Sequence, residues 1–339
     1  MKIAINGFGR IGRIFFRQVI NETQFEVKAI NDLTSPENLL YLLKYDSVYG
    51  RFEKEVELKG SKFIIDNKEI LIFNEKDPQN LPWKDLDIDV VVEATGIFTE
   101  REKAKAHLQA GAKVVVLTAP PKDDTLTLTP YLGDWDKIQT FSLGDIITSN
   151  ASCTTNSVNP VIAILDKRLG VLKAILTTIH AYTNTQSLVD SVTKGSDFRR
   201  GRAGAFNIIP STTGAAEAVI KVLPFLKDKF DGLSIRVPVI GGSLSDITMV
   251  VKRKTSVEEV NSIIEEEVQA NWQKIVKVIK EPVVSSDILK EPYGALIDLT
   301  LTKVVDGDLV KVFSWYDNEW GYCAMLKLHL LKIKDLIFK

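Results

Sequence analysis

The sequence is poor in the residues that mark disulfide-rich, zinc-binding and membrane-spanning proteins. Its 339 residues include only two cysteines and three histidines. The cysteines, Cys153 and Cys323, form neither a CxxC pair nor a Cys/His zinc spacing, so we expect no disulfide framework and no metal site. The longest apolar runs, such as IKVLP and AILTTI, are far shorter than the ~18 residues of a candidate membrane span. The N-terminal MKIAINGFGR has no long apolar stretch or cleavage site, so we expect a cytoplasmic protein without a membrane partner.

An excess of charge of one sign is also missing. The chain has 43 basic and 44 acidic residues, a net charge of −1, which gives no support for a nucleic-acid partner. Its length exceeds the ~250–300 residues at which a single hydrophobic core stops growing. We therefore expect two domains.

The first half alternates between short β-rich runs and helical stretches. Strands are predicted at 2–6, 25–31, 89–95 and 113–119, and helices at 10–20, 36–45 and 100–110. This order predicts parallel strands joined by crossover helices. Asp66 and Asn67 separate two apolar runs and predict an inserted hairpin.

The second half is dominated by alternating or β-branched runs, which predict an antiparallel or mixed sheet in an α+β domain. Strands are predicted at 172–182, 233–239, 246–251, 296–305 and 309–316. A helix is predicted to start at Ser256, with Glu259 as its capping-box partner, and to continue through 278. A last helical pattern covers 319–337.

Three glycines follow the first strand in the order Gly-Phe-Gly-Arg-Ile-Gly. Gly7, Gly9 and Gly12 lie where a helix begins, and Asp32 closes the second strand twenty positions after Gly12. This is the arrangement of a dinucleotide-binding unit, in which glycines let the backbone approach a pyrophosphate and the acid binds a ribose hydroxyl. The alternative is a glycine-rich turn that binds nothing. Because a carboxylate repels a 2′-phosphate, Asp32 favours NAD over NADP.

Cys153 lies in SNASCTTN, between a strand that ends near Ser149 and a predicted helix. At a helix N-terminus, unpaired N–H groups and the helix dipole stabilise a thiolate, so we expect a nucleophilic sulfur. The alternative is a buried structural cysteine. Pro160 leaves open whether this helix kinks or begins later.

His180 is the histidine best placed to act as a base, because it ends a strand and opens the polar segment HAYTNTQ. His107 and His329 lie in charged helices and are predicted to be bystanders. An ordinary hydrogen-bonded histidine remains the alternative for His180.

The segment that follows is rich in groups that bind anions. Arg236, isolated in the apolar run LSIRVPV, needs a charged partner, and a substrate phosphate is one candidate. The other groups are the basic residues Lys194, Arg199, Arg200 and Arg202, and the helix-start residues Thr212, Thr213 and Gly214. A solvated loop or a subunit contact is the alternative for the arginine cluster.

Six motifs together resemble phosphorylating glyceraldehyde-3-phosphate dehydrogenase in order along nearly the whole chain. They are INGFGRIGR, ASCTTN, HAYTNTQ, RRGRAGAFNIIPSTTGAA, IRVP and SWYDNEWGY. The resemblance implies a Rossmann-type parallel-sheet α/β domain at 1–152, completed by a C-terminal helix at 317–339, and an α+β catalytic domain at 153–316 with a mainly antiparallel or mixed sheet.

The resemblance also implies roles for individual residues. Cys153 would be the nucleophile and His180 its base. NAD would be held by Gly7, Gly9, Arg10, Ile11, Gly12, Asp32, Lys76, Thr118 and Asn318. Thr183 and Arg236 would bind the substrate's phosphate, and Ser152, Thr154, Arg202, Thr213 and Gly214 would surround inorganic phosphate. The implied reaction oxidises glyceraldehyde 3-phosphate to 1,3-bisphosphoglycerate through a hemithioacetal and a thioester, in a homotetramer.

The chain departs from the family pattern at two informative positions. Ser157 replaces a second cysteine that many members carry, and Val192 replaces a proline that often accompanies NAD preference. Two other functions remain open: an erythrose-4-phosphate dehydrogenase, whose acyl acceptor is water, and a non-catalytic NAD-dependent redox sensor that uses Cys153.

Overall fold

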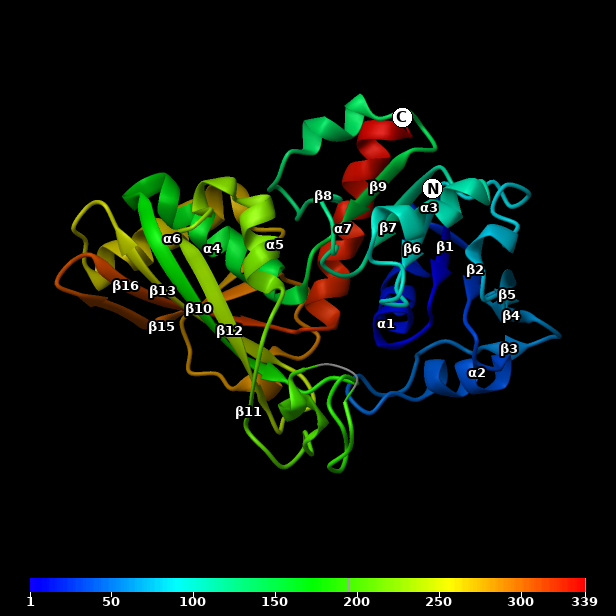
Figure 1. Cartoon of the computed structure of the whole chain (residues 1–339), viewed down its shortest axis with the longest axis horizontal. Coiled ribbons are helices and arrows are strands. Elements are labelled where there is room, and N and C mark those ends of the chain that lie inside the picture. The colour runs from blue at the N-terminus through cyan, green and yellow to red at the C-terminus, as the bar shows by residue number, and fades with distance from the viewer. Residues whose placement is uncertain (194–195, 339) are drawn as a thin grey trace. The chain divides into compact units, whose positions relative to one another are not determined.

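The computed structural model describes residues 1–193 and 196–338, so Lys194 lies outside the described residues. The chain divides into two compact units (Figure 1). The first unit contains residues 1–130 and 134–151 and the chain from 326 onward, and the second contains 131–133 and 152–325. The domain limits expected from the sequence remain a prediction.

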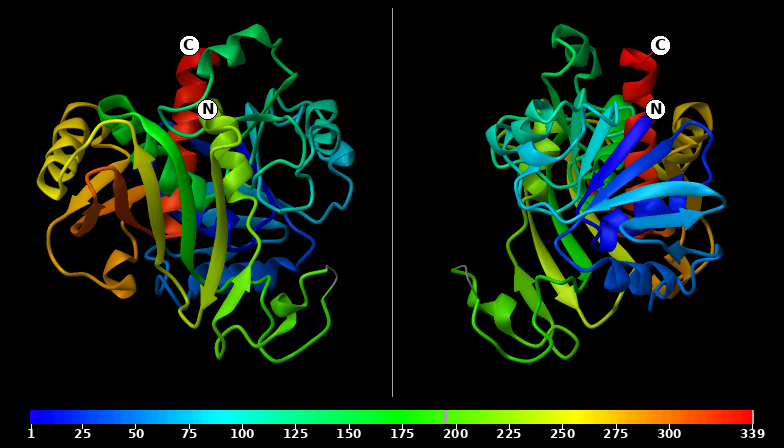
Figure 2. Two further views of the ribbon diagram at one scale, coloured as in Figure 1. Left: turned by 60° about the vertical axis from the view of Figure 1, so that its left-hand side comes forward. Right: turned by 90° about the vertical axis from the view of Figure 1, so that its right-hand side faces the viewer.

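The first unit contains a nine-stranded sheet that is mostly parallel, in the order β3-β4-β5-β2-β1-β6-β7-β9-β8 (Figure 2). From β5 to β8 every neighbouring pair is parallel. The predicted alternation of strands and helices is therefore confirmed. Its elements are β1 (Lys2–Asn6), α1 (Arg10–Val19), β2 (Glu26–Asn31), α2 (Pro36–Lys44), β3 (Glu57–Leu58), β4 (Lys62–Ile65), β5 (Lys68–Phe73), β6 (Val90–Glu93), α3 (Arg101–Gln109), β7 (Val114–Leu117), β8 (Leu126–Thr127) and β9 (Ile146–Ser149).

The predicted hairpin is confirmed between β4 and β5. Asp66 and Asn67 have φ angles of 48° and 63°, the left-handed conformation that a tight two-residue hairpin turn requires. After the turn, β5 pairs in parallel with β2, so the hairpin extends the main sheet at one edge.

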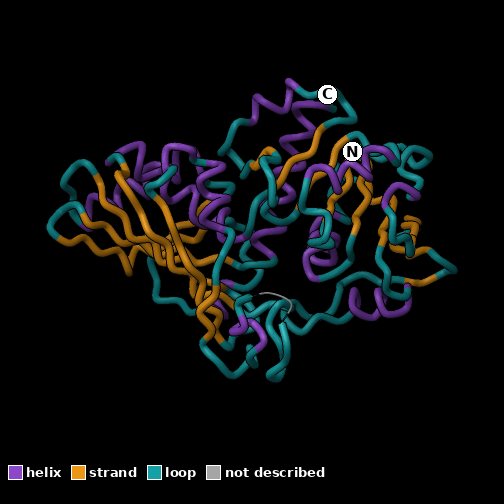
Figure 3. Tube along the Cα trace, viewed as in Figure 1, coloured by secondary structure: helices purple, strands orange, loops and turns teal. Residues whose placement is uncertain are grey.

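The second unit contains a seven-stranded mixed sheet, in the order β11-β12-β10-β13-β16-β15-β14 (orange in Figure 3). Helices α4, α5 and α6 pack against it. The β10–β12 and β14–β15 pairs are parallel and the others antiparallel, which confirms the predicted α+β class. Its elements are α4 (Cys153–Leu169), β10 (Val171–Ala181), β11 (Ile209–Ser211), α5 (Ala215–Val222), β12 (Phe230–Val237), β13 (Ser243–Val251), α6 (Val257–Glu267), β14 (Val276–Ile279), β15 (Ala295–Val305) and β16 (Leu309–Tyr316), followed by α7 (Trp320–Ile337), which runs on into the first unit.

The prediction for the helix after Ser256 was partly wrong. Ser256 caps α6 as expected, since its Oγ accepts a hydrogen bond from the Glu259 N–H. The Glu259 carboxylate, however, accepts from Thr255 Oγ1. The α-helix ends at Glu267 and continues as a π-helix over Val268–Trp272. Residues 276–278, predicted as helix, instead belong to strand β14 beside β15. Alternating β-branched residues in this stretch suit a strand once a partner strand is available.

Among residues 1–193 and 196–338, no helix is long and apolar enough to cross a membrane.

Candidate active site

Cys153 is the first residue of α4, as the sequence predicts. Ala151 adopts a positive φ of 55° in the turn after β9, and Ser152 caps the helix by accepting the Thr155 N–H at 3.0 Å. The helix runs through Pro160 to Leu169, so it does not begin later. The sulfur therefore lies at the positive end of a long helix.

The Cys153 sulfur faces His180 within the second unit. Sγ lies 3.5 Å from His180 Nε2, and the imidazole is only 4% exposed. Tyr316 packs edge-on against the imidazole, with ring centroids 5.9 Å apart, and its hydroxyl lies 2.9 Å from Thr154 Oγ1. The structure thus brings together the sulfur and the imidazole, residues 27 positions apart.

Strand register places Arg236 beside His180. The two residues are partners in the parallel pair β10–β12. Arg236 Nη1 lies 2.7 Å from His180 Nδ1 and donates to the Ala181 carbonyl at 3.1 Å. Its Nε is buried and has no hydrogen-bond partner among the described residues. An anion would complete the pairing of this guanidinium.

Burial shifts the pKa of both members of this pair. Burial, followed by the charge of Arg236, lowers the pKa of His180 to about 3. Burial raises the pKa of the Cys153 thiol, although Arg236 and hydrogen bonds from Thr154 oppose this shift. Burial thus opposes the ionisation that the helix N-terminus favours. The thiolate expected from the sequence stays a prediction.

The other residues that the family resemblance assigns to phosphate fall into three groups. Ser152 and Thr154 flank Cys153 on the first turn of α4. Thr213 and Gly214 precede α5, where Thr213 Oγ1 accepts the Ala215 N–H at 3.1 Å.

Thr183 and Arg202 lie in the segment between β10 and β11. Thr183 Oγ1 lies 2.9 Å from Thr185 Oγ1, and its N–H donates to Gln186 Oε1 at 2.8 Å. Arg202 is exposed, and its Nε donates to Asp190 at 2.8 Å. The charge of Arg202 is thus already matched by a carboxylate.

The turn formed by Gly7, Gly9 and Gly12 in the first unit leaves room for a pyrophosphate to approach the backbone closely. A Cβ on Gly7, whose φ is +92°, would lie 2.7 Å from the Thr95 nitrogen. A Cβ on Gly12 would lie 2.1 Å from the Gly7 carbonyl oxygen, so the first turn of α1 packs directly on the loop. A Cβ on Gly9, the N-cap of α1, would meet no atom within 4 Å, which leaves the helix N-terminus open to a pyrophosphate.

Asp32 is fixed beside this turn at the end of β2. Its Oδ2 accepts the Phe8 N–H at 2.7 Å and its Oδ1 accepts the Thr34 N–H at 2.9 Å. The carboxylate therefore stabilises the glycine turn by accepting a backbone hydrogen bond from it. It also lies at the carboxyl edge of the sheet, where dinucleotides bind in such folds.

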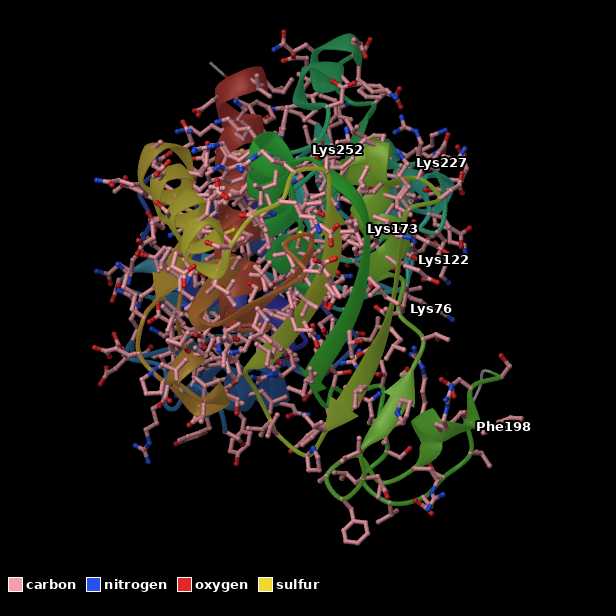
Figure 4. The ribbon with its side chains drawn as sticks, turned by 90° about the vertical axis from the view of Figure 1, so that its left-hand side faces the viewer. Lys76, Lys122, Lys173, Phe198, Lys227 and Lys252 are labelled. Carbon is pink, nitrogen blue, oxygen red and sulfur yellow. The ribbon has the colours of Figure 1, made fainter. Side chains whose placement is uncertain are left out.

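The remaining residues predicted to bind NAD in the first unit lie at the start of α1 and after two parallel strands. Arg10 forms an ion pair with Asp46, and Ile11 follows it in the first turn of α1. Lys76 is exposed after β5 (Figure 4), and Thr118 follows β7, where its hydroxyl donates to the Glu93 carbonyl at 3.0 Å. Nothing in the sequence indicated that Asp46 would pair with Arg10, because the two residues are 36 positions apart.

Asn318 is joined to the backbone beside His180 by a residue that the sequence analysis missed. The Ala181 N–H donates to Ser243 Oγ at 3.1 Å, and Ser243 Oγ donates to Asn318 Oδ1 at 3.1 Å. Both side chains are buried. The only available signal was the alternation of the strand SLSDITMVV, in which Ser243 and Ser245 share a face with Ile247, Met249 and Val251.

The two histidines predicted to be bystanders are buried within the first unit. His107 Nε2 lies 3.0 Å from Glu93 Oε2, and His107 Nδ1 accepts from the Trp83 indole at 3.1 Å. His329 lies 2.9 Å from Thr148 Oγ1 and packs on Trp135, with ring centroids 4.8 Å apart. Both make contacts typical of structural histidines.

Comparison with known proteins covers both units. Residues 1–101 match the NAD binding domain of glyceraldehyde 3-phosphate dehydrogenase, and residues 152–318 match its C-terminal domain. The chain is 48% identical over 323 residues to a glyceraldehyde-3-phosphate dehydrogenase of Thermotoga maritima, with 95% of each chain covered. It is 46% identical over 328 residues to the enzyme of Clostridium pasteurianum, with 96% of each covered. The first unit therefore contains the NAD-binding domain, and the chain belongs to the glyceraldehyde-3-phosphate dehydrogenase family.

Proposed function

We propose that this protein oxidises D-glyceraldehyde 3-phosphate to 1,3-bisphosphoglycerate with reduction of NAD, in glycolysis or gluconeogenesis. The observation that carries the proposal is the 3.5 Å approach of Cys153 Sγ to His180 Nε2 at the N-terminus of α4. The names of the relatives and the match to both family domains support the choice of substrate.

The chemistry begins with transfer of the Cys153 thiol proton to His180. The sulfur adds to the aldehyde carbon, and His180 returns the proton to the new alkoxide to give a hemithioacetal. His180 then takes the hydroxyl proton while hydride leaves the same carbon, so that a thioester remains on Cys153. NAD, when bound, supplies the hydride acceptor. A phosphate oxygen then attacks the thioester carbon, and Cys153 leaves and recovers its proton from His180.

Two sets of anion-binding residues support two phosphate positions. We assign the substrate's phosphate to Arg236 and Thr183, because the Arg236 guanidinium adjoins the base and has a buried N–H without a partner among the described residues. Inorganic phosphate is assigned to Ser152, Thr154, Thr213, Gly214 and Arg202. Arg202 fits this role only if it leaves Asp190.

The cofactor is assigned to the residues that the family resemblance implies, most of them at the carboxyl edge of the first unit's sheet. The assigned residues are Gly7, Gly9, Arg10, Ile11, Gly12, Asp32, Lys76, Thr118 and Asn318. The open space at Gly9 and the placement of Asp32 support NAD, whose ribose diol a carboxylate accepts.

The test is NADH formation with glyceraldehyde 3-phosphate or erythrose 4-phosphate, each with and without inorganic phosphate. We expect turnover that requires both glyceraldehyde 3-phosphate and phosphate. A preference for erythrose 4-phosphate that is indifferent to phosphate would support the erythrose-4-phosphate dehydrogenase instead. Cys153→Ser should abolish turnover while leaving NAD binding intact, whereas a redox sensor would show no turnover in either form.

We also propose that the protein is a cytoplasmic homotetramer. Cys153 and Cys323 both carry thiols, as is usual in a reducing compartment. The segment between β10 and β11 exposes large apolar side chains, including Phe198, which points away from the sheet in Figure 4. The others are Leu188, Val189, Val192, Phe206 and Ile208. Such a patch is typical of a subunit contact, and sedimentation equilibrium tests the oligomeric state.

A further inference from the structure

Glu93, the last residue of β6, carries a buried carboxyl group that is surrounded by hydrogen-bond donors. Its Oε1 accepts the N–H of Thr95 at 2.8 Å and also the Thr95 hydroxyl. Its Oε2 accepts from Asn6 Nδ2 at 2.6 Å and lies 3.0 Å from His107 Nε2. In the part of the chain that the structure describes, no lysine or arginine forms an ion pair with Glu93. Burial of such a group costs stability, which points to a role beyond folding.

The indole of Trp83 determines which nitrogen of His107 carries the ring proton. Trp83 Nε1 can only donate a hydrogen bond, and it lies 3.1 Å from His107 Nδ1. Nδ1 is therefore an acceptor, and the proton of the neutral ring lies on Nε2. The fully buried imidazole thus presents a fixed N–H donor to Glu93 Oε2.

Two linked amides determine the orientation of the Asn6 side chain. The Glu75 N–H donates to Asn31 Oδ1 at 2.8 Å, and Asn31 Nδ2 donates to the Glu75 carbonyl at 2.9 Å. Asn31 Nδ2 also donates to Asn6 Oδ1 at 2.7 Å. The amide nitrogen of Asn6 is therefore the atom that faces Glu93. Donors consequently face both oxygens of the Glu93 carboxyl group.

Each segment held by this network continues directly into a residue assigned to the cofactor. The pairs, with the network residue first, are Asn6 and Gly7, Asn31 and Asp32, and Glu75 and Lys76. Thr118, which is also assigned to the cofactor, donates its hydroxyl to the backbone carbonyl of Glu93 at 3.0 Å. Segments that are distant in the sequence are thus joined through one side chain.

Thr95 connects the position of the carboxyl group to the glycine turn. Its N–H donates to Glu93 Oε1, and the same nitrogen would lie only 2.7 Å from a Cβ on Gly7. Thr95 therefore packs directly on the backbone of Gly7. Because protein interiors are close-packed, a shift of the Glu93 side chain would displace Thr95 and the turn together.

Resting on the cofactor assignment of the proposed function, we propose that Glu93 is a positioning residue for NAD. Its buried carboxylate, held by His107 and Asn6, keeps the turns after β1, β2 and β6 in the arrangement that binds the dinucleotide before the dinucleotide arrives. A site arranged in advance binds more tightly, because binding then orders no further backbone. His107 acts through Glu93 and is a positioning residue in the same sense.

Glu93→Gln tests the proposal with a side chain of nearly the same shape. Whichever way the new amide turns, its NH₂ group faces a donor, either the Thr95 N–H or the donors of Asn6 and His107. We expect NAD to bind about tenfold more weakly by calorimetry, the factor expected if binding must then order one more backbone residue. KM for NAD should rise by the same factor, while kcat at saturating NAD stays within about twofold of the wild type.

The matched control is Glu267→Gln in the second unit. Glu267 is also a buried glutamate, but its carboxylate accepts from Lys167 Nζ at 2.8 Å and lies far from the glycine turn in the sequence. This variant should keep the wild-type affinity for NAD.

Amide hydrogen exchange gives a readout that does not depend on activity. In ligand-free Glu93→Gln we expect faster exchange than in the wild type in the turns after β1, β2 and β6, at residues 7–10, 32–35 and 95–98. Helix α4 in the second unit should exchange as it does in the wild type. Saturation with NAD should restore much of the lost protection.

Two substitutions of His107 keep the inference testable if Glu93→Gln does not fold. Glutamine retains an N–H that can donate to Glu93, so His107→Gln should bind NAD as the wild type does. Phenylalanine fills a similar volume without a donor, so His107→Phe should show the weaker binding. Equal NAD affinity in these two variants would contradict the inference, whatever urea unfolding shows about their stabilities.

Two further results would overturn the inference: an affinity of Glu93→Gln for NAD within about twofold of the wild type, or an equal loss of affinity in Glu267→Gln. The proposed function fails separately. Turnover of glyceraldehyde 3-phosphate by a wild type whose NAD affinity does not respond to Glu93→Gln contradicts only the inference. Weaker NAD binding and faster exchange in Glu93→Gln, without turnover in the wild type, contradict only the function.

Discussion

Mild acid should destabilise this protein through the buried histidine of α7, and His329→Gln should remove that part of the pH dependence. His329 is fully buried against Trp135 and Thr148. Burial lowers its pKa from 6.5 to about 3. Between these two pH values the unfolded chain binds a proton that the folded protein does not, so stability falls as the pH falls through this window.

The size of the effect follows from proton linkage. Above pH 6.5 the histidine is neutral in both states and contributes no pH dependence. Below that pH the folded state loses about 1.4 kcal/mol per pH unit. For a pKa of about 3 in the folded protein, the loss at pH 5 relative to pH 8 is about 2 kcal/mol. His180 has a similarly lowered pKa and adds a comparable amount.

The assay is urea unfolding of the wild type and His329→Gln at pH 8 and pH 5, at one fixed protein concentration. Glutamine keeps an amide near Thr148 but does not titrate, and its packing loss is the same at both pH values and cancels in the difference. We expect the drop in the free energy of unfolding between pH 8 and pH 5 to be about 2 kcal/mol smaller in the variant. Thr148→Val, which keeps the histidine, is the control and should retain the wild-type difference. Equal pH dependence in wild type and His329→Gln would refute the reasoning.

Three further substitutions test the cofactor assignment and the packing of the glycine turn. Asp32→Ala should weaken NAD binding about tenfold or more by calorimetry while affecting NADP less, because the lost carboxylate accepts only from a free ribose diol; equal weakening of both would contradict that role. Gly12→Ala places a Cβ 2.1 Å from a backbone carbonyl of the glycine turn, so thermal unfolding should show a loss of about 1–3 kcal/mol, and an unchanged melting temperature would refute the close packing. Ser243→Ala removes the hydroxyl bonded to Asn318 and should weaken NAD binding severalfold, whereas Ser234→Ala, which removes another buried hydroxyl, should not; the same loss in both variants would mean a general packing effect.

Long-range pairing limited what was predictable about the fold. The alternation of strands and helices in the first unit is confirmed because each element is encoded by its own periodicity. The stretch 276–278 was mispredicted as helix because its β conformation depends on pairing with β15, and that partner follows it in the chain. Local patterns cannot report such a partner.

The sequence by itself determined the features that depend on neighbouring residues: the glycine turn at the start of α1, the capping of α4 by Ser152, and the position of Cys153 at a helix N-terminus. Only the tertiary structure decided that Arg236 lies within hydrogen-bond distance of His180. That contact comes from the register of two strands that are distant in the sequence. The tertiary structure also decided how burial acts on the pair, since burial raises the pKa of the Cys153 thiol and lowers that of His180 to about 3. Ionisation depends on how completely the folded chain excludes water from a group, and no local pattern of residues records that exclusion.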